Sequence, residues 1–578
     1  MRTDFRMIAL PARISSAIAL LLLALAITLP FLGSHHYLPI PTFHQEWLAG
    51  VLGLAAALTL ALASNRTWHV PHTAMLPLAL VGLLWLQAAV GLDVRFESSL
   101  IASLYLVWAF LLMLATRCIA DDLGRDRTSE LLAGALLAGA LLLAFTGALQ
   151  RWAPWLGMPW IFPSETIKGN VAQPNNFADY LWLGIAAACW LVAMRRLHAL
   201  FLLITLPALI GLSLMSGSRS VYLYTAALTL WLLLCSRARP DGDRRRWLWL
   251  AATLPPLLLA LQWMIGVLDN GSVATAQRLA AQGSYDPVRA TLWRAALDIF
   301  SDHPLLGAGF DSFSRLFFLR IESYPINGVG IPEHSHNLLT EFAAEFGVAG
   351  LALLAAGCAL LARSVRRRID DATMLAGGIL LVLGIHSLLE YPLWYAYFLA
   401  IAALMIALLD NGQWRLPVAP RHRVVLGGLC LAGFAVLAGL RSDYKELEEA
   451  ANGREADGRP IAAEAQHAAL LKIYSRSLLR PYAALQFAAR MPIESSEVVG
   501  KVALLAEVQQ FSPIRQSAFR YAMLLQMAGK PEEARRQWHI ATLAYPREEA
   551  IARTMLLNAV TREPGLQALL IAIDQRSF

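Results

Sequence analysis

The sequence predicts an all-α, polytopic membrane protein, on the evidence of its composition and of the spacing of its apolar segments. Hydrophobic residues make up 57% of the 578 residues, and charged residues only 15%. This composition excludes an ordinary soluble enzyme. Apolar runs of about 20 residues follow one another from residue 14 onward, and a helix of that length spans the roughly 30 Å of bilayer hydrocarbon. We therefore predict about 13 transmembrane helices.

The loops between the apolar runs predict the orientation in the membrane. The predicted cytoplasmic loops hold 21 arginines, whereas the short external loops hold four basic residues, namely Arg95, Arg151, Lys168 and Arg219. This asymmetry places the N-terminus in the cytoplasm, and an odd number of spans then places the C-terminal region outside. The predicted spans are 14–32, 47–63, 74–92, 99–116, 130–149, 175–194, 197–215, 219–235, 247–266, 337–362, 372–389, 392–409 and 424–440.

Four regions follow from these spans. They are N-terminal transmembrane helices in 1–266, a large external loop in 267–336, C-terminal transmembrane helices in 337–440, and an external tail in 441–578. The tail has no span-length apolar run, so we expect a separate soluble helical domain. Within it, 517–546 predicts two helices broken at Gly529, similar to a tetratricopeptide hairpin. A plain helical cap is the alternative.

Composition and spacing also indicate what the protein does not bind. The net charge of +7 does not point to nucleic acid, because the basic residues lie in short loops between apolar runs. The five cysteines show neither a disulfide framework nor a metal-binding spacing. The external loops contain no pair of carboxylates at glycosidase spacing and no Asp-rich cation cluster. We therefore expect no nucleic acid, no metal and no cofactor.

Polar side chains at the outer ends of two predicted spans are candidates for ligand contact. Gln173 and Asn175 lie where a helix enters lipid, and carboxamides there need partners, either neighbouring backbone or a polar ligand such as a sugar. Helix capping by Asn175 is the alternative. Tyr391 and Tyr395 lie in a short external link, where a phenol can bind sugar or diphosphate oxygens. For them the alternative is anchoring at the membrane interface.

His386 and Glu390 are spaced four residues apart on the predicted span before this link. Polar pairs inside a membrane usually face the protein interior. We expect this pair to orient the two tyrosines.

External arginines are the candidates for binding an anion. Arg219 lies in the turn 215–220, where the positive-inside rule disfavours a cation, and a guanidinium binds phosphate oxygens bidentately. Snorkelling toward lipid phosphate is the alternative. Arg289 and Arg294 belong to 287–300, a segment with helical periodicity that we expect to lie along the membrane surface.

Two histidines close the long external loop just before the predicted span 337–362. Histidine accepts a proton readily near neutral pH. His336 begins the helix and is the candidate general base, with His334 as its local competitor and a structural role as the alternative. Earlier in the loop, 303–310 predicts a turn in which glycine allows close backbone approach. We expect Glu345, in the first turns of the span, to be structural.

These motifs together resemble a known family. Trp293-Arg294, the run from His303 to Phe310, and His336-Asn337-Leu338-Leu339 followed by Glu345, Gly347 and Gly350 are similar to the Wzy_C superfamily. That superfamily comprises O-antigen ligases, O-antigen polymerases and bacterial O-linked oligosaccharyltransferases. The segments 173–178 and 390–395, together with the soluble tail, look like the PglL-type enzymes that glycosylate proteins.

The resemblance implies a glycosyltransferase of the bacterial inner membrane with its tail in the periplasm. Its donor would be a glycan on undecaprenyl pyrophosphate, and its acceptor a serine or threonine of a periplasmic protein such as pilin. The implied roles are general base for His336, pyrophosphate contact for Arg219 first and for Arg294 and Arg289 second, and glycan or acceptor contact for Gln173, Asn175, Tyr391 and Tyr395.

The expected reaction is metal-independent and inverts the anomeric centre, because no side chain is evident as a nucleophile for a covalent glycosyl intermediate. Two alternatives share the donor site. A lipid A core ligase or an O-antigen polymerase would accept a sugar hydroxyl in place of a protein hydroxyl. A membrane transporter is the alternative of a different class, although no inverted repeat is evident in the sequence.

Overall fold

The computed structural model describes residues 11–63, 67–92, 95–268, 287–324, 326, 330–417, 419–455 and 457–575. The predicted external loop therefore lies partly outside the described residues. The chain forms two compact units. Unit 1 comprises Met1–Val81, Leu104–Tyr285 and Leu353–Ala438, and unit 2 comprises Gly82–Ser103, Asp286–Ala352 and Gly439–Phe578.

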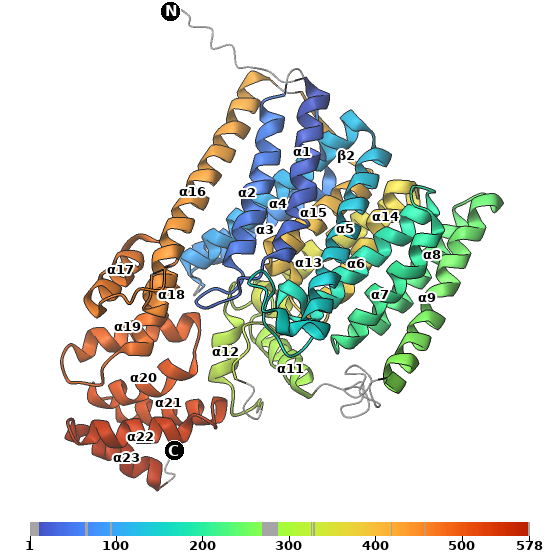
Figure 1. Ribbon diagram of the computed structural model, residues 1–578. Helices are drawn as coiled ribbons and strands as arrows, with labels where there is room; N and C mark the ends of the chain where they lie inside the picture. The colour runs from blue at the N-terminus through green and yellow to red at the C-terminus, as the bar shows by residue number, and fades with distance from the viewer. Residues whose placement is uncertain are drawn as a thin grey trace, which may run out of the picture. The chain divides into compact units, whose positions relative to one another are not determined.

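The helices of unit 1, some of which continue into unit 2, form most of the predicted membrane region (Figure 1). They are α1 (Ala12–Ala26), α2 (Phe43–Ala61), α3 (Met75–Ala89), α4 (Phe96–Leu123), α5 (Arg125–Trp152), α6 (Pro174–Ala193), α7 (Leu202–Met215), α8 (Ser220–Arg237), α9 (Asp241–Leu268), α13 (Leu338–Arg367), α14 (Asp371–Ser387), α15 (Ala396–Leu409) and α16 (Pro420–Asn452). Short 3-10 turns are η1 (Leu29–Leu32), η2 (His72–Ala74), η3 (Pro154–Leu156), η4 (Gly169–Val171), η5 (Ala199–Phe201) and η6 (Pro392–Trp394).

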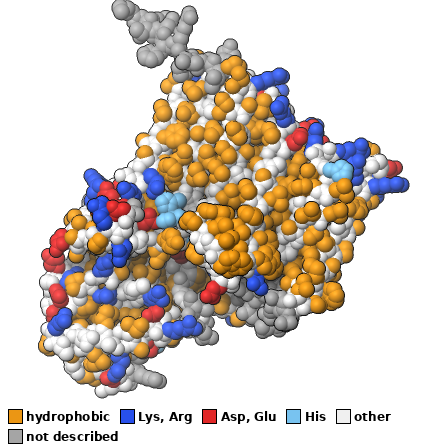
Figure 2. All heavy atoms as spheres, viewed as in Figure 1, with side chains coloured by type: hydrophobic (Ala, Val, Ile, Leu, Met, Phe, Trp, Pro, Cys, Tyr) orange, Lys and Arg blue, Asp and Glu red, His pale blue; other side chains and the backbone are white. Residues whose placement is uncertain are grey.

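These helices confirm the predicted all-α, polytopic class. Among the described residues, nine helices are long and apolar enough to cross a membrane. The other four predicted spans coincide with the 19-residue α2 and with three shorter apolar helical segments, Ala199–Met215, Asp371–Ser387 and Ala396–Leu409. Figure 2 shows hydrophobic side chains spread over the surface of the long helices, as contact with lipid requires.

Helix α6 is the central helix of unit 1. Every residue from Asn176 to Ala193 is buried, and α6 packs against α5, α7, α8 and α14. An apolar helix enclosed on all sides has a fixed axial position and rotation. The polar residues on its first turn are therefore held in defined places.

One feature of unit 1 was not predicted. Strands β1 (Thr67–Pro71) and β2 (Gln413–Pro417) pair as an antiparallel ribbon, with Thr67 opposite Pro417 and His69 opposite Arg415. The two segments are far apart in sequence, and each is too short to show a strand pattern by itself.

Unit 2 joins helices of the external loop to those of the tail. The loop supplies α11 (Pro287–Asp302) and α12 (Phe313–Leu319). The tail supplies α17 (Ala463–Arg476), α18 (Arg480–Arg490), α19 (Val498–Phe511), α20 (Arg515–Met527), α21 (Pro531–Ala544), α22 (Glu549–Val560), η7 (Pro564–Leu566) and α23 (Gln567–Asp574).

One hydrophobic core connects these two sets of helices. Phe313 and Phe317 of α12 belong to the same buried cluster as Phe519 of α20 and Trp538 of α21. The rings of Phe519 and Trp538 meet edge to face with their centroids 5.0 Å apart. The predicted helix break at Gly529 is confirmed, with a φ of 77° between α20 and α21. Loop and tail therefore stabilise each other.

Candidate functional site

His336 lies directly before α13, in a short polar segment of unit 2. Its side chain is half-buried, and its φ of 56° places its backbone in the left-handed region. Histidine is one of the few non-glycine residues that adopt this region with some frequency, but the conformation is unfavourable without support. The next residue, Asn337, caps the helix by accepting hydrogen bonds from the backbone N of Leu339 at 2.9 Å and of Thr340 at 3.4 Å.

His334 is engaged by a buried carboxylate. Its Nδ1 lies 3.0 Å from Glu341 Oε1, and the other oxygen of Glu341 accepts a hydrogen bond from the backbone N of Ser335 at 2.6 Å. Burial lowers the pKa of His334, but the hydrogen bond and negative charge of Glu341 outweigh it and raise the pKa to about 9. His334 is therefore protonated at neutral pH and poorly suited to accept a further proton.

Two glycines, Gly307 and Gly347, allow the loop 303–310 to pack against the first part of α13. Gly307, with a φ of 73°, lies so close to the backbone of Glu345 that a Cβ would clash. Gly347 breaks the helix with a φ of 62°, and a Cβ there would lie 2.6 Å from the backbone N of Gly307. Backbone hydrogen bonds join the two segments, from Ala308 N to Ala344 O at 2.8 Å and from Val348 N to Pro304 O at 2.8 Å.

Side chains reinforce this packing. Glu345 Oε1 accepts hydrogen bonds from the backbone N of Ser312 at 3.1 Å and of Phe313 at 3.3 Å, at the start of α12. Gln87 was not identified from the sequence. It donates to the backbone oxygens of Leu306 and Glu345, both at 2.7 Å. A single glutamine in an otherwise apolar helix was the available signal, since such a side chain requires a partner.

Helix α11 presents its arginines on the side away from the core. Leu292, Ala295 and Ile299 are buried, as the predicted apolar stripe required. Arg294 is exposed and Arg289 half-buried. The side chain of Arg294 is therefore accessible from outside the core of unit 2.

In unit 1 the structure joins two predicted motifs that are more than 200 residues apart. Asn175 Nδ2 donates a hydrogen bond to Glu390 Oε1 at 2.7 Å, and Asn176 Oδ1 lies 2.9 Å from His386 Nε2. The other ring nitrogen of His386 lies 3.1 Å from the hydroxyl of Tyr224. These bonds fix the start of α6 to the end of α14.

The capping residue of α6 differs from the one that the sequence suggested, which was Asn175. Gln173, and not Asn175, is the capping residue, because its side-chain oxygen accepts a hydrogen bond from the backbone N of Asn176. Asn175 lies one residue into the helix and therefore projects sideways to Glu390. Each carboxamide has one polar atom, Gln173 Nε2 and Asn175 Oδ1, to which no described residue is hydrogen-bonded.

The two predicted tyrosines belong to an aromatic cluster between α14 and α15. The rings of Tyr391 and Tyr395 have centroids 5.8 Å apart, and those of Tyr395 and Tyr397 are stacked at 5.5 Å. Glu46, on the first turn of α2, accepts hydrogen bonds from the backbone N of Ala396 and from the hydroxyl of Tyr105. Glu46 was missed, although a carboxylate at the edge of an uncharged span is a recognisable signal.

Arg219 lies at the position directly before α8. Buried serines lie on both sides of it, with Ser218 Oγ and Ser220 Oγ 2.7 Å apart. The side chain of Arg219 is half-buried, and its backbone directly precedes the N–H groups of the first turn of α8. Such groups attract anions.

The predicted residues form two sets. Those in unit 1 are Arg219, Gln173, Asn175, Tyr391 and Tyr395, and those in unit 2 are His336, Arg289 and Arg294.

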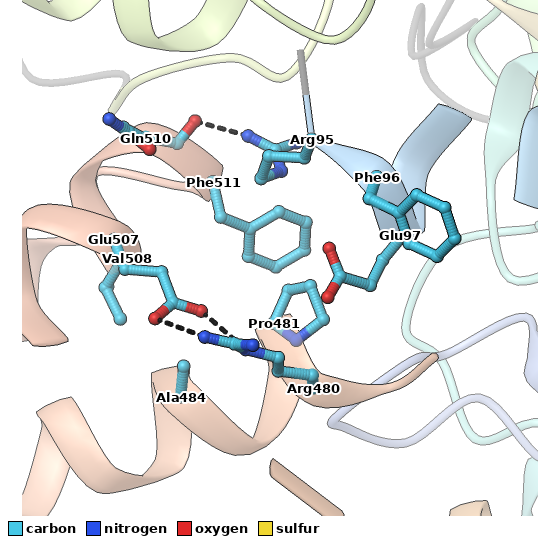
Figure 3. A pocket seen from close by; sticks show the side chains of 10 residues that line it. All are labelled: Arg95, Phe96, Glu97, Arg480, Pro481, Ala484, Glu507, Val508, Gln510 and Phe511. Atoms are coloured by element: carbon cyan, nitrogen blue, oxygen red, sulfur yellow. Dashed lines mark hydrogen bonds and ion pairs between the residues drawn. The ribbon is translucent and has the colours of Figure 1, made fainter. Parts of the chain in front are cut away.

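Unit 2 also contains a cavity of about 290 Å³ that none of the predicted site residues lines. It lies among the start of α4, α18 and α19 (Figure 3). Arg480 and Glu507 form a bidentate ion pair on one side, at 3.0 and 3.1 Å. On the other side the guanidinium of Arg95 lies 4.8 Å from the ring centre of Phe511. Arg95 pairs with Asp311, which does not line the cavity.

Comparison with known proteins gives two family matches. Residues 199–355 match the family described as O-antigen ligase (Wzy_C), and residues 374–556 match the family described as virulence factor membrane-bound polymerase, C-terminal. The first region contains Arg219, Arg289, Arg294 and His336, and the second contains Tyr391 and Tyr395.

Two curated relatives come from Acinetobacter baylyi. The chain is 27% identical to a general O-oligosaccharyltransferase over 448 residues, which are 74% of this chain and 75% of the relative. It is 24% identical to a ComP-specific O-oligosaccharyltransferase over 390 residues, which are 64% of this chain and 68% of the relative.

Proposed function

The chain belongs to the Wzy_C (O-antigen ligase) family of membrane glycosyltransferases, and we propose that it is an O-linked oligosaccharyltransferase that glycosylates proteins. The observation that carries the proposal is the extent of the match to the general O-oligosaccharyltransferase, which covers three quarters of both chains. A match of this length includes the membrane helices as well as the catalytic loop. The proposed donor is a glycan on undecaprenyl pyrophosphate, and the proposed acceptor is a serine or threonine of a periplasmic protein such as pilin.

In the proposed reaction His336 is the general base. It removes the proton of the acceptor hydroxyl while the hydroxyl oxygen bonds to the anomeric carbon and the bond from that carbon to the diphosphate oxygen breaks. His334 is the poorer candidate, because the carboxylate of Glu341 keeps its pKa near 9 and its ring protonated. Displacement from the opposite face inverts the anomeric centre and needs no metal.

The leaving diphosphate requires positive charge that is already in place. We assign this role to Arg219 first, since it lies beside the backbone N–H groups that begin α8. Arg294 and Arg289 on α11 are the second candidates. Gln173, Asn175, Tyr391 and Tyr395 are the proposed contacts for the glycan or the acceptor, and the polar atoms Gln173 Nε2 and Asn175 Oδ1 are the ones to meet sugar hydroxyls.

The proposed location is the bacterial inner membrane, with the N-terminus in the cytoplasm and the tail in the periplasm. The positive-inside asymmetry supports this orientation. The same orientation places the loop containing His336 on the side where exported proteins appear.

A second candidate function is glycan polymerisation, which the match of residues 374–556 to the membrane-bound polymerase family favours. The two functions differ in the acceptor alone. Expression in a host that supplies lipid-linked glycan, with and without a pilin-like protein, separates them. Protein glycosylation requires that the glycan appear on the pilin-like protein. Longer lipid-linked chains alone would assign the protein to the polymerases, and glycan on lipid A core alone would assign it to the ligases.

The tail is a proposed docking surface for the acceptor, but removing it is a poor test. Phe519 and Trp538 share a core with Phe313 and Phe317, so truncation would expose part of the catalytic loop's own packing. Substitutions of exposed tail residues, such as Val499→Glu, leave the core intact. Such variants should change the acceptor KM and leave donor binding unaltered.

A further inference from the structure

The residues on both sides of His336 are tied to the first turns of α13. On the C-terminal side, Asn337 caps the helix through its side chain, and its backbone oxygen accepts a hydrogen bond from Glu341 N at 2.9 Å. On the N-terminal side, the backbone N of Ser335 donates to Glu341 Oε2 at 2.6 Å. Because the two neighbours are held by the same helical turn, the chain must reverse sharply at His336. This reversal explains its left-handed φ of 56°.

Glu341 takes part in the hydrogen bonds that hold both neighbours of His336, Ser335 and Asn337. Its backbone N binds Asn337, one carboxylate oxygen binds the backbone of Ser335, and the other lies 3.0 Å from His334 Nδ1. Its relative exposure is 2%, and that of Ser335 is 0%. Water therefore cannot readily replace these bonds, and a buried carboxylate of this kind requires its partners.

His334 supplies the positive charge that Glu341 needs. Burial would favour the neutral imidazole, but Glu341, with Glu345 and Glu333 also contributing, raises the pKa of His334. The ring of His334 and the carboxylate of Glu341 form a pair 3.0 Å apart in the segment that ends at His336. A second connection is provided by Ser335 Oγ, 2.9 Å from Thr340 Oγ1.

We propose that Glu341 is a positioning residue for His336, holding the catalytic imidazole in place through Ser335 and His334 without touching the reacting atoms. This inference rests on the proposed role of His336 as general base. Displacing a catalytic group by about 1 Å can cost about 100-fold in rate. The consequence of losing Glu341 should therefore be seen in turnover.

A simpler role for Glu341 is a favourable charge at the N-terminus of α13. Any acidic side chain within the first turn serves that purpose, so this role depends on charge and not on reach. The proposed role depends on both, because one carboxylate must contact two partners at once. Glu345 illustrates the difference, since its Oε1 instead binds the backbone N of Ser312 at the start of α12.

The experiment compares Glu341→Gln with Glu341→Asp in the purified full-length protein, with one undecaprenyl-pyrophosphate-linked glycan and a purified pilin-like acceptor. Gln keeps the reach but loses the charge and one of the two acceptor oxygens. Asp keeps the charge but is shorter by one methylene, so its carboxylate cannot contact Ser335 and His334 at the same time. We expect turnover to fall about 10- to 100-fold in both variants, with the donor KM within about twofold of wild type.

Glu322→Gln is the matched control, because Glu322 is an exposed glutamate of the same external loop and undergoes the same chemical change. It should leave turnover unaltered. Wild-type turnover in Glu341→Asp would show that Glu341 acts only as a charge at the end of α13. A parallel loss of donor binding in both variants would show that it supports the structure in general. Either result overturns the inference. His336→Ala in the same assay separates the two proposals, since an active His336→Ala protein contradicts the proposed base and not the geometry around Glu341.

Discussion

His336 and His386 both lie close to the end of a helix, yet their surroundings differ in ways that indicate different roles. His386 is fully buried on α14, and its two ring nitrogens contact Asn176 and Tyr224 at 2.9 and 3.1 Å. His336 is half-buried, in a left-handed backbone conformation that neighbouring bonds maintain. An imidazole enclosed by two partners fastens helices together, whereas one that reaches the surface can exchange a proton with a substrate.

The largest expected effect is the loss of transfer in His336→Ala. Removal of a general base typically lowers the rate by about 10²- to 10⁴-fold, and protein level and donor binding should remain close to wild type. Transfer is measured with purified enzyme, lipid-linked glycan and acceptor protein. Near-wild-type transfer would refute the assignment of His336, and an inactive His334→Ala beside it would move the role to His334.

The next effect concerns the diphosphate. Arg219→Ala should lower turnover by about 100-fold and Arg219→Lys by about 10-fold, because lysine keeps the charge but loses the bidentate geometry. Equal activity of the lysine variant and the wild type would indicate a long-range charge effect only. A chelator should not affect the wild-type enzyme, so inhibition by EDTA that added divalent cation reverses would show that the metal-free mechanism is wrong.

His386→Ala should act on stability and not on chemistry. It removes the imidazole that contacts both Asn176 and the hydroxyl of Tyr224 inside the protein, at a cost of about 2–4 kcal/mol in the free energy of unfolding. Tyr224→Phe removes one of the two bonds and should cost about 1 kcal/mol. Thermal unfolding in detergent measures both. If folded His386→Ala protein were as inactive as His336→Ala, the contrast between the two histidines would be lost.

The smallest effect is a dependence of stability on pH that arises from His334. Its pKa is raised from 6.5 to about 9 by folding. A raised pKa contributes stability that is fully present below pH 6.5 and disappears as the pH rises through about 9. The stability of wild-type protein should therefore decrease between these values more than that of His334→Gln. Parallel unfolding curves for the two proteins across this range would contradict the ion pair with Glu341.

The helices and the family were accessible from the sequence because both are encoded locally. Runs of about 20 apolar residues predicted every helix of the membrane region. The same holds for the apolar stripe of α11 and the glycines of the turn 303–310, since each depends on residues close together in the chain. The motif that ends in His336 also indicated the family without any tertiary information.

Other features of the candidate site could not be predicted from local sequence patterns. Glu46 lies at the edge of an apolar span and Gln87 is the single glutamine of an apolar helix, but only the folded structure shows which backbone groups they bind. The sequence allowed Asn175 either to cap α6 or to contact a ligand, and in the structure Gln173 is the capping residue. The partners of Glu46, Gln87 and Asn175 are distant in sequence, so no local pattern identifies them.

The sequence by itself determined an all-α membrane protein, its helical segments, and a family motif containing His336. The reason is that hydrophobic periodicity and short motifs operate over distances of a few residues along the chain. The tertiary structure alone decided that Asn175 contacts Glu390, that Gln87 binds the backbone of Leu306 and Glu345, and that loop and tail share one core. These contacts result from the packing of helices against one another, where burial forces each polar group to find a partner and each apolar face to be covered.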